Sequence, residues 1–255
     1  MGFLRSVKHI ASRSGGAALD LLFPAQCARC REPVGAAGSL CANCWPDVTF
    51  ISAPFCEQCG YPFEYEVGTG MTCGNCLADP PPFTQGRSVL KYDAESRDMI
   101  LSFKHADRTD QAPVFANWMV RTAGDILSED VLITPVPLHS RRLIKRRFNQ
   151  SALLAGAIAK ITNKRLIQDL LIRKRATPSQ GSKSFKGRFR NVKGAFSVNT
   201  RWLTKVKGEH VILVDDVYTT GATVAACSQC LLKAGAREVS VLTLCRVVRP
   251  ARLSI

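Results

Sequence analysis

The stretch VILVDDVYTTGAT, residues 211–223, decides the fold. Four aliphatic residues are followed by two adjacent carboxylates and then by a hydroxyl-rich turn that contains a glycine. The continuous apolar run is typical of a strand that is buried on both faces of a parallel sheet. Because an unpaired carboxylate is costly to bury, we expect Asp215 and Asp216 to bind something outside the fold.

The stretch lies in a chain that alternates between strand-like and helix-like segments from residue 83 onward. Such alternation predicts an α/β domain, with a parallel sheet flanked by helices on both faces. In sheets of this kind, ligands bind beyond the carboxyl ends of the strands, which is where the two carboxylates lie. The expected strands are 87–92, 131–136, 210–217 and 237–248, and the expected helices are 149–162 and 221–236.

The turn after the carboxylates has the composition of a phosphate site. Its backbone N–H groups, its threonine hydroxyls and Gly221 come just before a helix N-terminus, and this combination favours anions. The two carboxylates would repel a phosphate alone, but they suit sugar hydroxyls or a Mg²⁺ ion that bridges to further phosphates. A ribose 5-phosphate that carries a second, metal-bound phosphate group therefore satisfies every part of the stretch.

Eight of the eleven cysteines form four C-x-x-C pairs in the N-terminal third of the chain. Each pair aims two thiolates at one point, and two pairs complete a tetrahedral Zn²⁺ site. Sequential pairing predicts two zinc sites, and a cross-braced arrangement of alternate pairs is the alternative. Disulfides would need an oxidising compartment, which nothing in the sequence signals. The expected ligands are Cys27, Cys30, Cys41 and Cys44 at one site and Cys56, Cys59, Cys73 and Cys76 at the other.

Positive charge is concentrated in one part of the chain. Residues 132–210 contain 19 of the 35 basic residues and two of the 20 acidic ones, which favours a surface that faces phosphates. Aromatic residues interleaved with cations suit base stacking on single-stranded nucleic acid, and burial in the core is the alternative. The phenylalanines concerned are Phe148, Phe185, Phe189 and Phe196.

The zinc-ribbon segment has the opposite charge. Residues 27–76 contain two basic and five acidic residues, so they would bind a phosphate backbone poorly. We expect a structural module, or one that docks a protein partner.

The sequence does not suggest a membrane-spanning protein. No apolar run approaches the ~18–20 residues that a membrane span requires, and we expect a cytoplasmic protein, with the inner membrane face as an alternative location. Asp20 interrupts the apolar patch near the N-terminus. We expect an amphipathic helix there that packs on its own protein, or else lies on a membrane surface. The expected organisation is an N-terminal helix at 1–26, a double zinc ribbon at 27–80 and the α/β domain at 81–255.

Residues 211–223 closely resemble the phosphoribosyl-pyrophosphate (PRPP) loop of the type I phosphoribosyltransferases, from which only Tyr218 departs, where an aliphatic residue is commoner. The segments 100–108, 135–155 and 175–196 look like the ComF family, which joins an N-terminal double zinc ribbon to a phosphoribosyltransferase-like domain. This resemblance covers the chain from Leu19 onward. Arg147 is a further departure, because the family more often has glycine there. The resemblance implies the type I phosphoribosyltransferase fold and a link to DNA uptake in natural transformation.

The resemblance also implies a role for each part of the site. The candidate catalytic residues, Asp215 and Asp216, would hold the ribose hydroxyls, and Lys104 and His105 would reach in from the segment that receives the acceptor base. The 5-phosphate would be bound by Thr219, Thr220, Gly221, Ala222 and Thr223. The pyrophosphate loop would include Val136, Pro137, Arg141 and Arg142. A flexible loop over the site would offer Lys174, Arg175 and Gln180.

Three functions follow from these features. An active glycosyltransferase would transfer the phosphoribosyl group of Mg²⁺-bound PRPP to a nitrogen nucleophile. A binding protein with the same pocket would instead handle single-stranded DNA through residues 132–210. In a third alternative, the zinc ribbons dock a protein of the competence machinery and the pocket is vestigial. We expect Mg²⁺-dependent binding of PRPP and a role in DNA uptake; the sequence indicates no acceptor base.

Overall fold

The structure is a computed structural model, and it describes residues 24–248 except 37, 67, 69, 106–107, 125, 128–129, 140–142, 145–146, 176–189, 191 and 193. The chain forms two units, residues 1–47 and 48–255. The first contains one cysteine cluster, and the second contains the other cluster together with the α/β fold. The N-terminal helix expected at 1–26 lies almost entirely outside the described residues. The domain boundaries expected at residues 26 and 80 stay predictions.

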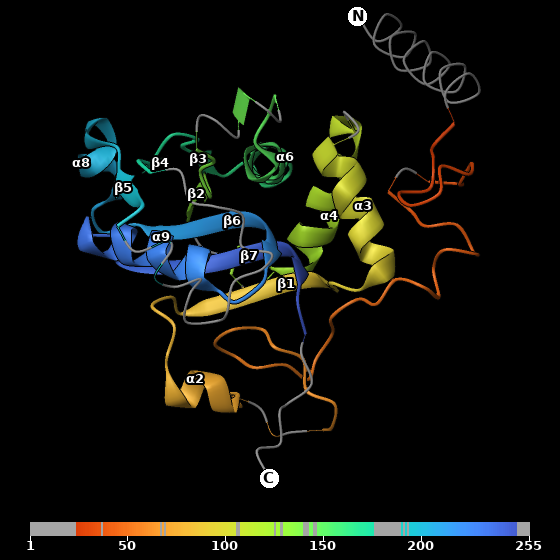
Figure 1. Cartoon of the computed structure of the whole chain (residues 1–255), viewed down its shortest axis with the longest axis horizontal. Coiled ribbons are helices and arrows are strands. Elements are labelled where there is room, and N and C mark those ends of the chain that lie inside the picture. Colours follow the sequence, from red (N-terminus) through yellow and green to blue (C-terminus); the bar gives the residue numbers. More distant parts are fainter. Residues whose placement is uncertain are drawn as a thin grey trace, which may run out of the picture. The chain divides into compact units, whose positions relative to one another are not determined.

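The larger unit is built on a parallel sheet of five strands in the order β1-β7-β6-β2-β3 (Figure 1). β6 pairs with β2 on one side and with β7 on the other, and β7 pairs in turn with β1. The predicted α/β fold with a parallel sheet is therefore confirmed. The strands are β1 (Gln85–Lys91), β2 (Leu132–Pro135), β3 (Arg165–Leu166), β6 (His210–Tyr218) and β7 (Glu238–Arg246).

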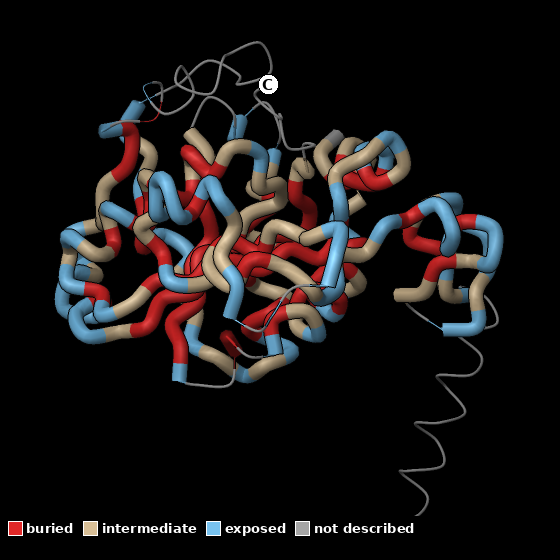
Figure 2. The backbone as a smooth tube through the Cα atoms, turned by 90° about the horizontal axis from the view of Figure 1, so that it is seen from below, coloured by how far each residue is buried: buried red, intermediate tan, exposed pale blue. Residues whose placement is uncertain are grey.

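The aliphatic run of β6 lies in the core, and Figure 2 shows buried residues gathered in the interior of the larger unit. All four residues 211–214 are fully buried. Val211 and Leu213 share a hydrophobic cluster with Val224 and Leu231 of helix α9 (Ala222–Lys233). Because alternate side chains of a strand point to opposite faces, the intervening residues face the other side of the sheet. This double burial explains why the run is continuous rather than alternating.

Further helices pack on the sheet beside β1, β2, β6 and β7 (Figure 1). Helix α4 (Ala112–Thr122) contacts β1 and β7, and helix α6 (Gln150–Thr162) contacts β2 and β6; the two helices also pack on one another. Helix α3 (Ala94–His105) precedes them. In the described part of the chain, no helix combines the length and the apolar character needed to cross a membrane.

A small antiparallel pair, β4 (Leu171–Arg173) and β5 (Phe196–Val198), lies beside α9 and was not expected from the sequence. Phe196 is buried in the core beneath the guanidinium of Arg173, which lies 5.2 Å from the ring centroid. The stacking role considered for Phe196 is therefore wrong, whereas Phe185 and Phe189 lie outside the described residues. The remaining short elements are α2 (Gly74–Ala78), η1 (Thr109–Gln111), η2 (Thr200–Trp202) and α8 (Leu203–Val206).

Candidate functional site

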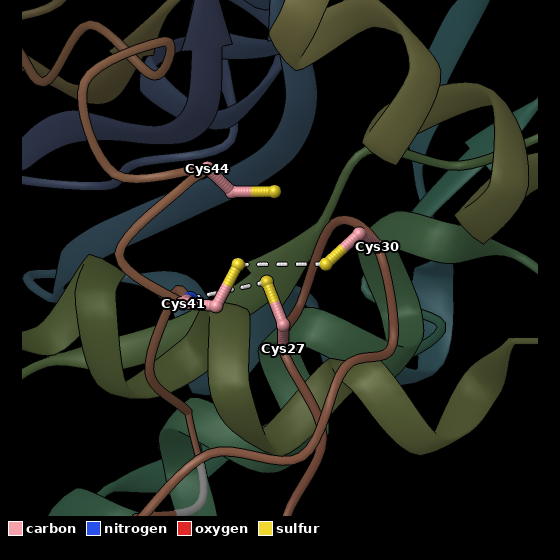
Figure 3. A group of neighbouring side chains, drawn as sticks. All are labelled: Cys27, Cys30, Cys41 and Cys44. Atoms are coloured by element: carbon pink, nitrogen blue, oxygen red, sulfur yellow. Dashed lines mark hydrogen bonds between the residues drawn. The ribbon is translucent and has the colours of Figure 1, made fainter.

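The eight N-terminal cysteines form two groups of four. In each group the four sulfur atoms lie within 4.8 Å of one another, as the ligands of a single Zn²⁺ ion do. Figure 3 shows the first group converging, with the sulfurs of Cys30 and Cys41 3.5 Å apart. The sequential pairing is confirmed and the cross-braced one is wrong, and the chain has two Cys₄ zinc-ribbon sites. They consist of Cys27, Cys30, Cys41 and Cys44, and of Cys56, Cys59, Cys73 and Cys76.

The two ribbons repeat the same hydrogen bonds. The sulfur of Cys27 accepts from the backbone N–H of Cys41 at 3.3 Å, and the sulfur of Cys56 accepts from that of Cys73 at 3.2 Å. Backbone donors of this kind orient a thiolate and stabilise its charge, which suits a metal ligand. The two segments are therefore structural repeats of one module.

The second ribbon approaches the backbone of β1 closely at Gly60. Its φ is +70°, and a Cβ atom there would collide with the carbonyl oxygen of Gly86 in β1. A Cβ on Gly86 would in turn lie 3.1 Å from the carbonyl oxygen of Cys59. The equivalent residue of the first ribbon is Arg31, which has a φ of 72° and an exposed side chain. Two glycines thus let the second ribbon pack directly on the edge of the sheet.

The two carboxylates at the end of β6 have different partners. Asp215 accepts a hydrogen bond of 2.9 Å from the hydroxyl of Ser151, at the start of α6. Asp216 forms an ion pair with Lys104 of α3, at 2.7 Å between Oδ2 and Nζ. The side chains of this pair are only 15% and 16% exposed. Two helices that are distant in sequence therefore meet at the carboxylates, and Lys104 is among the residues that the sequence placed near the site.

Burial raises the pKa of Asp215 to about 7, and the adjacent charge of Asp216 adds to the rise. The hydrogen bond from Ser151 and the positive charge of Lys104 act in the opposite direction. Asp215 is therefore divided between its protonated and charged forms near neutral pH. A cation or a set of hydroxyl donors beside it would favour the charged form.

A small, open hollow adjoins Asp215 at the start of α9. In the adjoining turn, the hydroxyl oxygen of Thr220 is buried and has no hydrogen-bond partner in the part of the chain that is described. Gly221 has a φ of +78°, which few other residues adopt, and the first N–H groups of a helix have no partners within it. The arrangement leaves unused donors for an anion. The hollow is lined by Asp215, Val217, Tyr218, Thr219, Gly221, Thr223 and Val224.

The Tyr218 side chain lies against Gly221 in this loop. A Cβ atom on Gly221 would collide with the Tyr218 hydroxyl, so the ring requires glycine at that position as much as the backbone angle does. Burial raises the pKa of the Tyr218 hydroxyl to about 12. The guanidinium of Arg246 lies 4.2 Å from the ring centroid. Sequence reasoning noted Tyr218 only as a departure from the loop pattern, and it missed Ser151 and Arg246.

The structure describes only some of the residues predicted for the pyrophosphate loop and the flexible loop. Val136 is buried, its N–H donates to the carbonyl of Val214 at 2.8 Å, and its own carbonyl accepts from the Asn149 side chain at 3.0 Å. These bonds hold the start of the predicted pyrophosphate loop at the end of β2. Lys174 and Arg175 are exposed and follow β4. Arg141, Arg142, Gln180 and the side chain of His105 lie outside the described structure.

Comparisons with known proteins agree with this organisation. A family model described as a double zinc ribbon domain matches residues 18–77, and one described as a phosphoribosyl transferase domain matches residues 149–253. The chain is 33% identical over 236 residues to the DNA utilization protein YhgH of Shigella flexneri, covering 89% of this chain and 100% of that protein. It is 29% identical over 238 residues to Competence protein F of Haemophilus influenzae, covering 88% and 98%.

Solved structures overlap with a smaller part of the chain. The glutamine phosphoribosylpyrophosphate amidotransferase of B. subtilis, complexed with ADP and GMP, is 24% identical and covers 55% of this chain and 30% of its own, with a TM-score of 0.37. A score this low supports no inference of its own.

Proposed function

The chain belongs to the ComF family, and from that membership we propose that it binds Mg²⁺-PRPP in the hollow after β6 and serves in DNA uptake. The observation that carries the proposal is the loop itself. A carboxylate pair precedes a turn in which the buried Thr220 hydroxyl lacks a partner among the described residues, and Gly221 leads into α9. Relatives named for competence and for DNA utilization support the cellular role.

In this proposal the 5-phosphate binds to residues 219–223. The Thr220 hydroxyl donates the hydrogen bond that it does not make within the described chain, and the first N–H groups of α9 donate to the other phosphate oxygens. The ribose hydroxyls bind to Asp215 and Asp216. Lys104 neutralises Asp216 and so limits the repulsion between the carboxylates and the phosphates.

The pyrophosphate group binds beyond β2, where Val136 is held by hydrogen bonds to Val214 and Asn149. Arg141 and Arg142 supply positive charge, and Lys174, Arg175 and Gln180 close over the ligand. Carboxylate oxygens are ligands that Mg²⁺ accepts, and bound Mg²⁺ would neutralise part of the pyrophosphate charge. If the protein is a transferase, Asp215 and Asp216 stabilise the positive charge that develops on the ribose as the bond to pyrophosphate breaks.

The basic segment supports a second function, the binding of single-stranded DNA. Exposed cations occur along residues 132–210, among them Arg147, Lys160 and Lys174. Because Phe196 is buried in the core, it contributes no base stacking, and the exposed cations supply the phosphate contacts of this second function.

Calorimetric titration of PRPP, with and without Mg²⁺, tests the main proposal. The zinc-loaded wild type should bind PRPP with a micromolar Kd in the presence of Mg²⁺, and Asp215→Asn should weaken binding by at least about tenfold, which is about 1.4 kcal/mol. Asp98→Asn, which removes an exposed carboxylate of α3, is the control and should bind normally. The same variants are titrated with a fluorescent single-stranded oligonucleotide.

The outcomes separate the two functions. Asp215→Asn should preserve or strengthen DNA binding, because it removes a charge that repels phosphates. Weaker DNA binding in this variant would mean that the two ligands share one site. Failure of the folded, zinc-loaded wild type to bind PRPP would overturn the main proposal and leave DNA binding as the function to pursue.

A further inference from the structure

Arg246, at the end of β7, is a buried cation in an unusual setting. Arg246 is only 6% exposed. Its guanidinium donates from Nη1 to the Cys59 carbonyl at 2.6 Å and from Nη2 to the Cys59 sulfur at 3.3 Å. Within the described part of the chain, the other recorded partners of the guanidinium are the rings of Tyr61 and Tyr218, and no carboxylate is among them. Burying a cation without a counter-charge costs several kcal/mol.

The second zinc site supplies the missing charge. One Zn²⁺ ion with four thiolates has a net negative charge, and the four sulfurs around Cys59 have the spacing of such a site. Donors that hydrogen-bond to a metal-bound sulfur commonly stabilise the metal site. Arg246 is thus placed as an outer partner of this zinc site, through its hydrogen bond to Cys59.

The same guanidinium reaches the loop proposed to bind the 5-phosphate. It lies 4.2 Å from the ring centroid of Tyr218, and the Tyr218 ring also packs edge-on against Phe83 at 6.4 Å. The hydroxyl of Tyr218 lies against Gly221, where no side chain would fit. A continuous set of contacts therefore runs from Cys59 through Arg246 and Tyr218 to Gly221.

We propose that Arg246 and Tyr218 are positioning residues that couple occupancy of the second zinc site to the conformation of the phosphate loop. With zinc bound, Arg246 is held between the Cys59 sulfur and the Tyr218 ring, and the ring supports Gly221. Without zinc, Arg246 loses its counter-charge and Tyr218 loses its cation–π partner. The proposal rests on the proposed function, since it concerns the same loop, and it implies that ligand and zinc each strengthen the binding of the other.

The first zinc site makes a suitable comparison because its arginine has a carboxylate. Arg29 forms an ion pair with Asp47 within the smaller unit, and the hydrogen bond to Asp47, together with its charge, raises the pKa of Arg29. Arg29 therefore has a carboxylate as a counter-charge, whereas the recorded partners of Arg246 among the described residues include none. Substituting Arg29 removes an arginine from a zinc ribbon while leaving the contacts of Arg246 intact.

Pulsed alkylation with iodoacetamide, in the presence of a zinc chelator and followed by mass spectrometry, reports each cysteine of the full-length, zinc-loaded protein separately. In Arg246→Gln, Cys59 and Cys76 should be alkylated about tenfold faster, while Cys30 and Cys44 keep their wild-type rates. Arg246→Lys, which keeps the charge but not the planar fork, should be intermediate. Arg29→Gln should leave Cys59 and Cys76 unchanged.

Calorimetry on the same proteins tests the coupling. Arg246→Gln and Tyr218→Leu should each bind PRPP about fivefold more weakly, which is about 1 kcal/mol, and Arg29→Gln should bind it normally. Saturating PRPP should slow the alkylation of Cys59 about threefold in the wild type and not in Tyr218→Leu, as reciprocity requires. Denaturation by urea establishes that each variant is folded.

Two results would overturn the inference. Unchanged alkylation of Cys59 in Arg246→Gln would show that Arg246 does not stabilise the zinc site. Faster alkylation with unchanged PRPP affinity in both Arg246→Gln and Tyr218→Leu would show that site and loop are independent. If the wild type itself fails to bind PRPP, the proposed function is wrong, and the alkylation rates of Cys59 still decide the role of Arg246 at zinc.

Discussion

Lys104 Nζ lies 2.7 Å from Asp216 Oδ2, so that helix α3 provides the positive charge for one of the two carboxylates that end β6. The charge of Lys104 also lowers the pKa of Asp215, although burial dominates and leaves that pKa raised to about 7. A single lysine therefore influences both members of the carboxylate pair. Removing Lys104 takes away the positive charge that acts on both carboxylates, which lie next to the loop proposed to bind phosphates.

Lys104→Gln should weaken the binding of Mg²⁺-PRPP about fivefold, about 1 kcal/mol, because the two carboxylates then repel the phosphates more strongly. Calorimetry at low and at moderate salt measures the change. Lys160→Gln, which removes an exposed cation from the last turn of α6, is the matched control and should have a much smaller effect. Equal losses in both variants would point to overall charge instead of the contact with Asp216.

Asp215→Asn should make the folded protein more stable relative to the wild type as the pH rises. The pKa of Asp215 in the folded state is raised to about 7, above its value of about 3.9 in the unfolded chain. Between these values the folded state binds the extra proton, so raising the pH costs wild-type stability that the asparagine variant does not lose.

Urea unfolding at pH 5 and pH 8 tests this difference. The free energy of unfolding of Asp215→Asn minus that of the wild type should increase by roughly 1–3 kcal/mol between the two pH values. Asp98→Asn, at an exposed position of α3, should show no such increase. A difference for Asp215→Asn that is the same at both pH values would contradict the raised pKa.

Gly60→Ala should destabilise the larger unit by about 2–4 kcal/mol, because a left-handed backbone disfavours alanine and the new methyl group meets the Gly86 carbonyl. Gly208→Ala is a control with a similar φ of +76° but open space around the position. It should cost only about 1–2 kcal/mol, the backbone part of the penalty. Urea unfolding compares the two variants, and equal losses would show that the second ribbon does not depend on close packing against β1.

Arg146→Gln/Arg147→Gln should flatten the salt dependence of single-stranded DNA binding. Each lost phosphate contact lowers the slope of log Kobs against log salt by about 0.7, so two contacts lower it by about 1.4. Arg97→Gln/Lys233→Gln removes two exposed cations outside residues 132–210 and should leave the slope unchanged. Fluorescence anisotropy across a salt series measures both variants. The same slope in wild type and Arg146→Gln/Arg147→Gln would exclude these residues from the DNA contact.

The central strands were predictable because their signal is local. The aliphatic run of β6 reads as a doubly buried strand, and the C-x-x-C spacing reads as paired zinc ligands. The order of the strands was not predictable in this way, because β1 pairs with β7, which follows it only after most of the larger unit's sequence. The strand pair β4–β5 is also too short, at three residues each, for a periodic pattern to stand out.

Within the candidate site, too, the residues that are adjacent in sequence could be predicted and the distant ones could not. The loop after β6 could be recognised because its groups are adjacent in sequence. Ser151 and Arg246 could not, because their contacts with Asp215 and Cys59 join positions 64 and 187 residues apart. Arg147 left a partial signal: the family more often has glycine there, and the residue does adopt a positive φ of 67°, where glycine is the easier choice.

The position of β7 has a consequence for the order of events during synthesis. β7 is the last strand of the described chain, yet it lies inside the sheet, between β1 and β6. A ribosome makes β1 long before β7, so β1 and the cysteines beside it must wait with an unpaired edge and an incomplete core. Such exposed edges are prone to association with other chains. Early capture of zinc by the second ribbon would give the waiting N-terminal part some order before the final strand arrives.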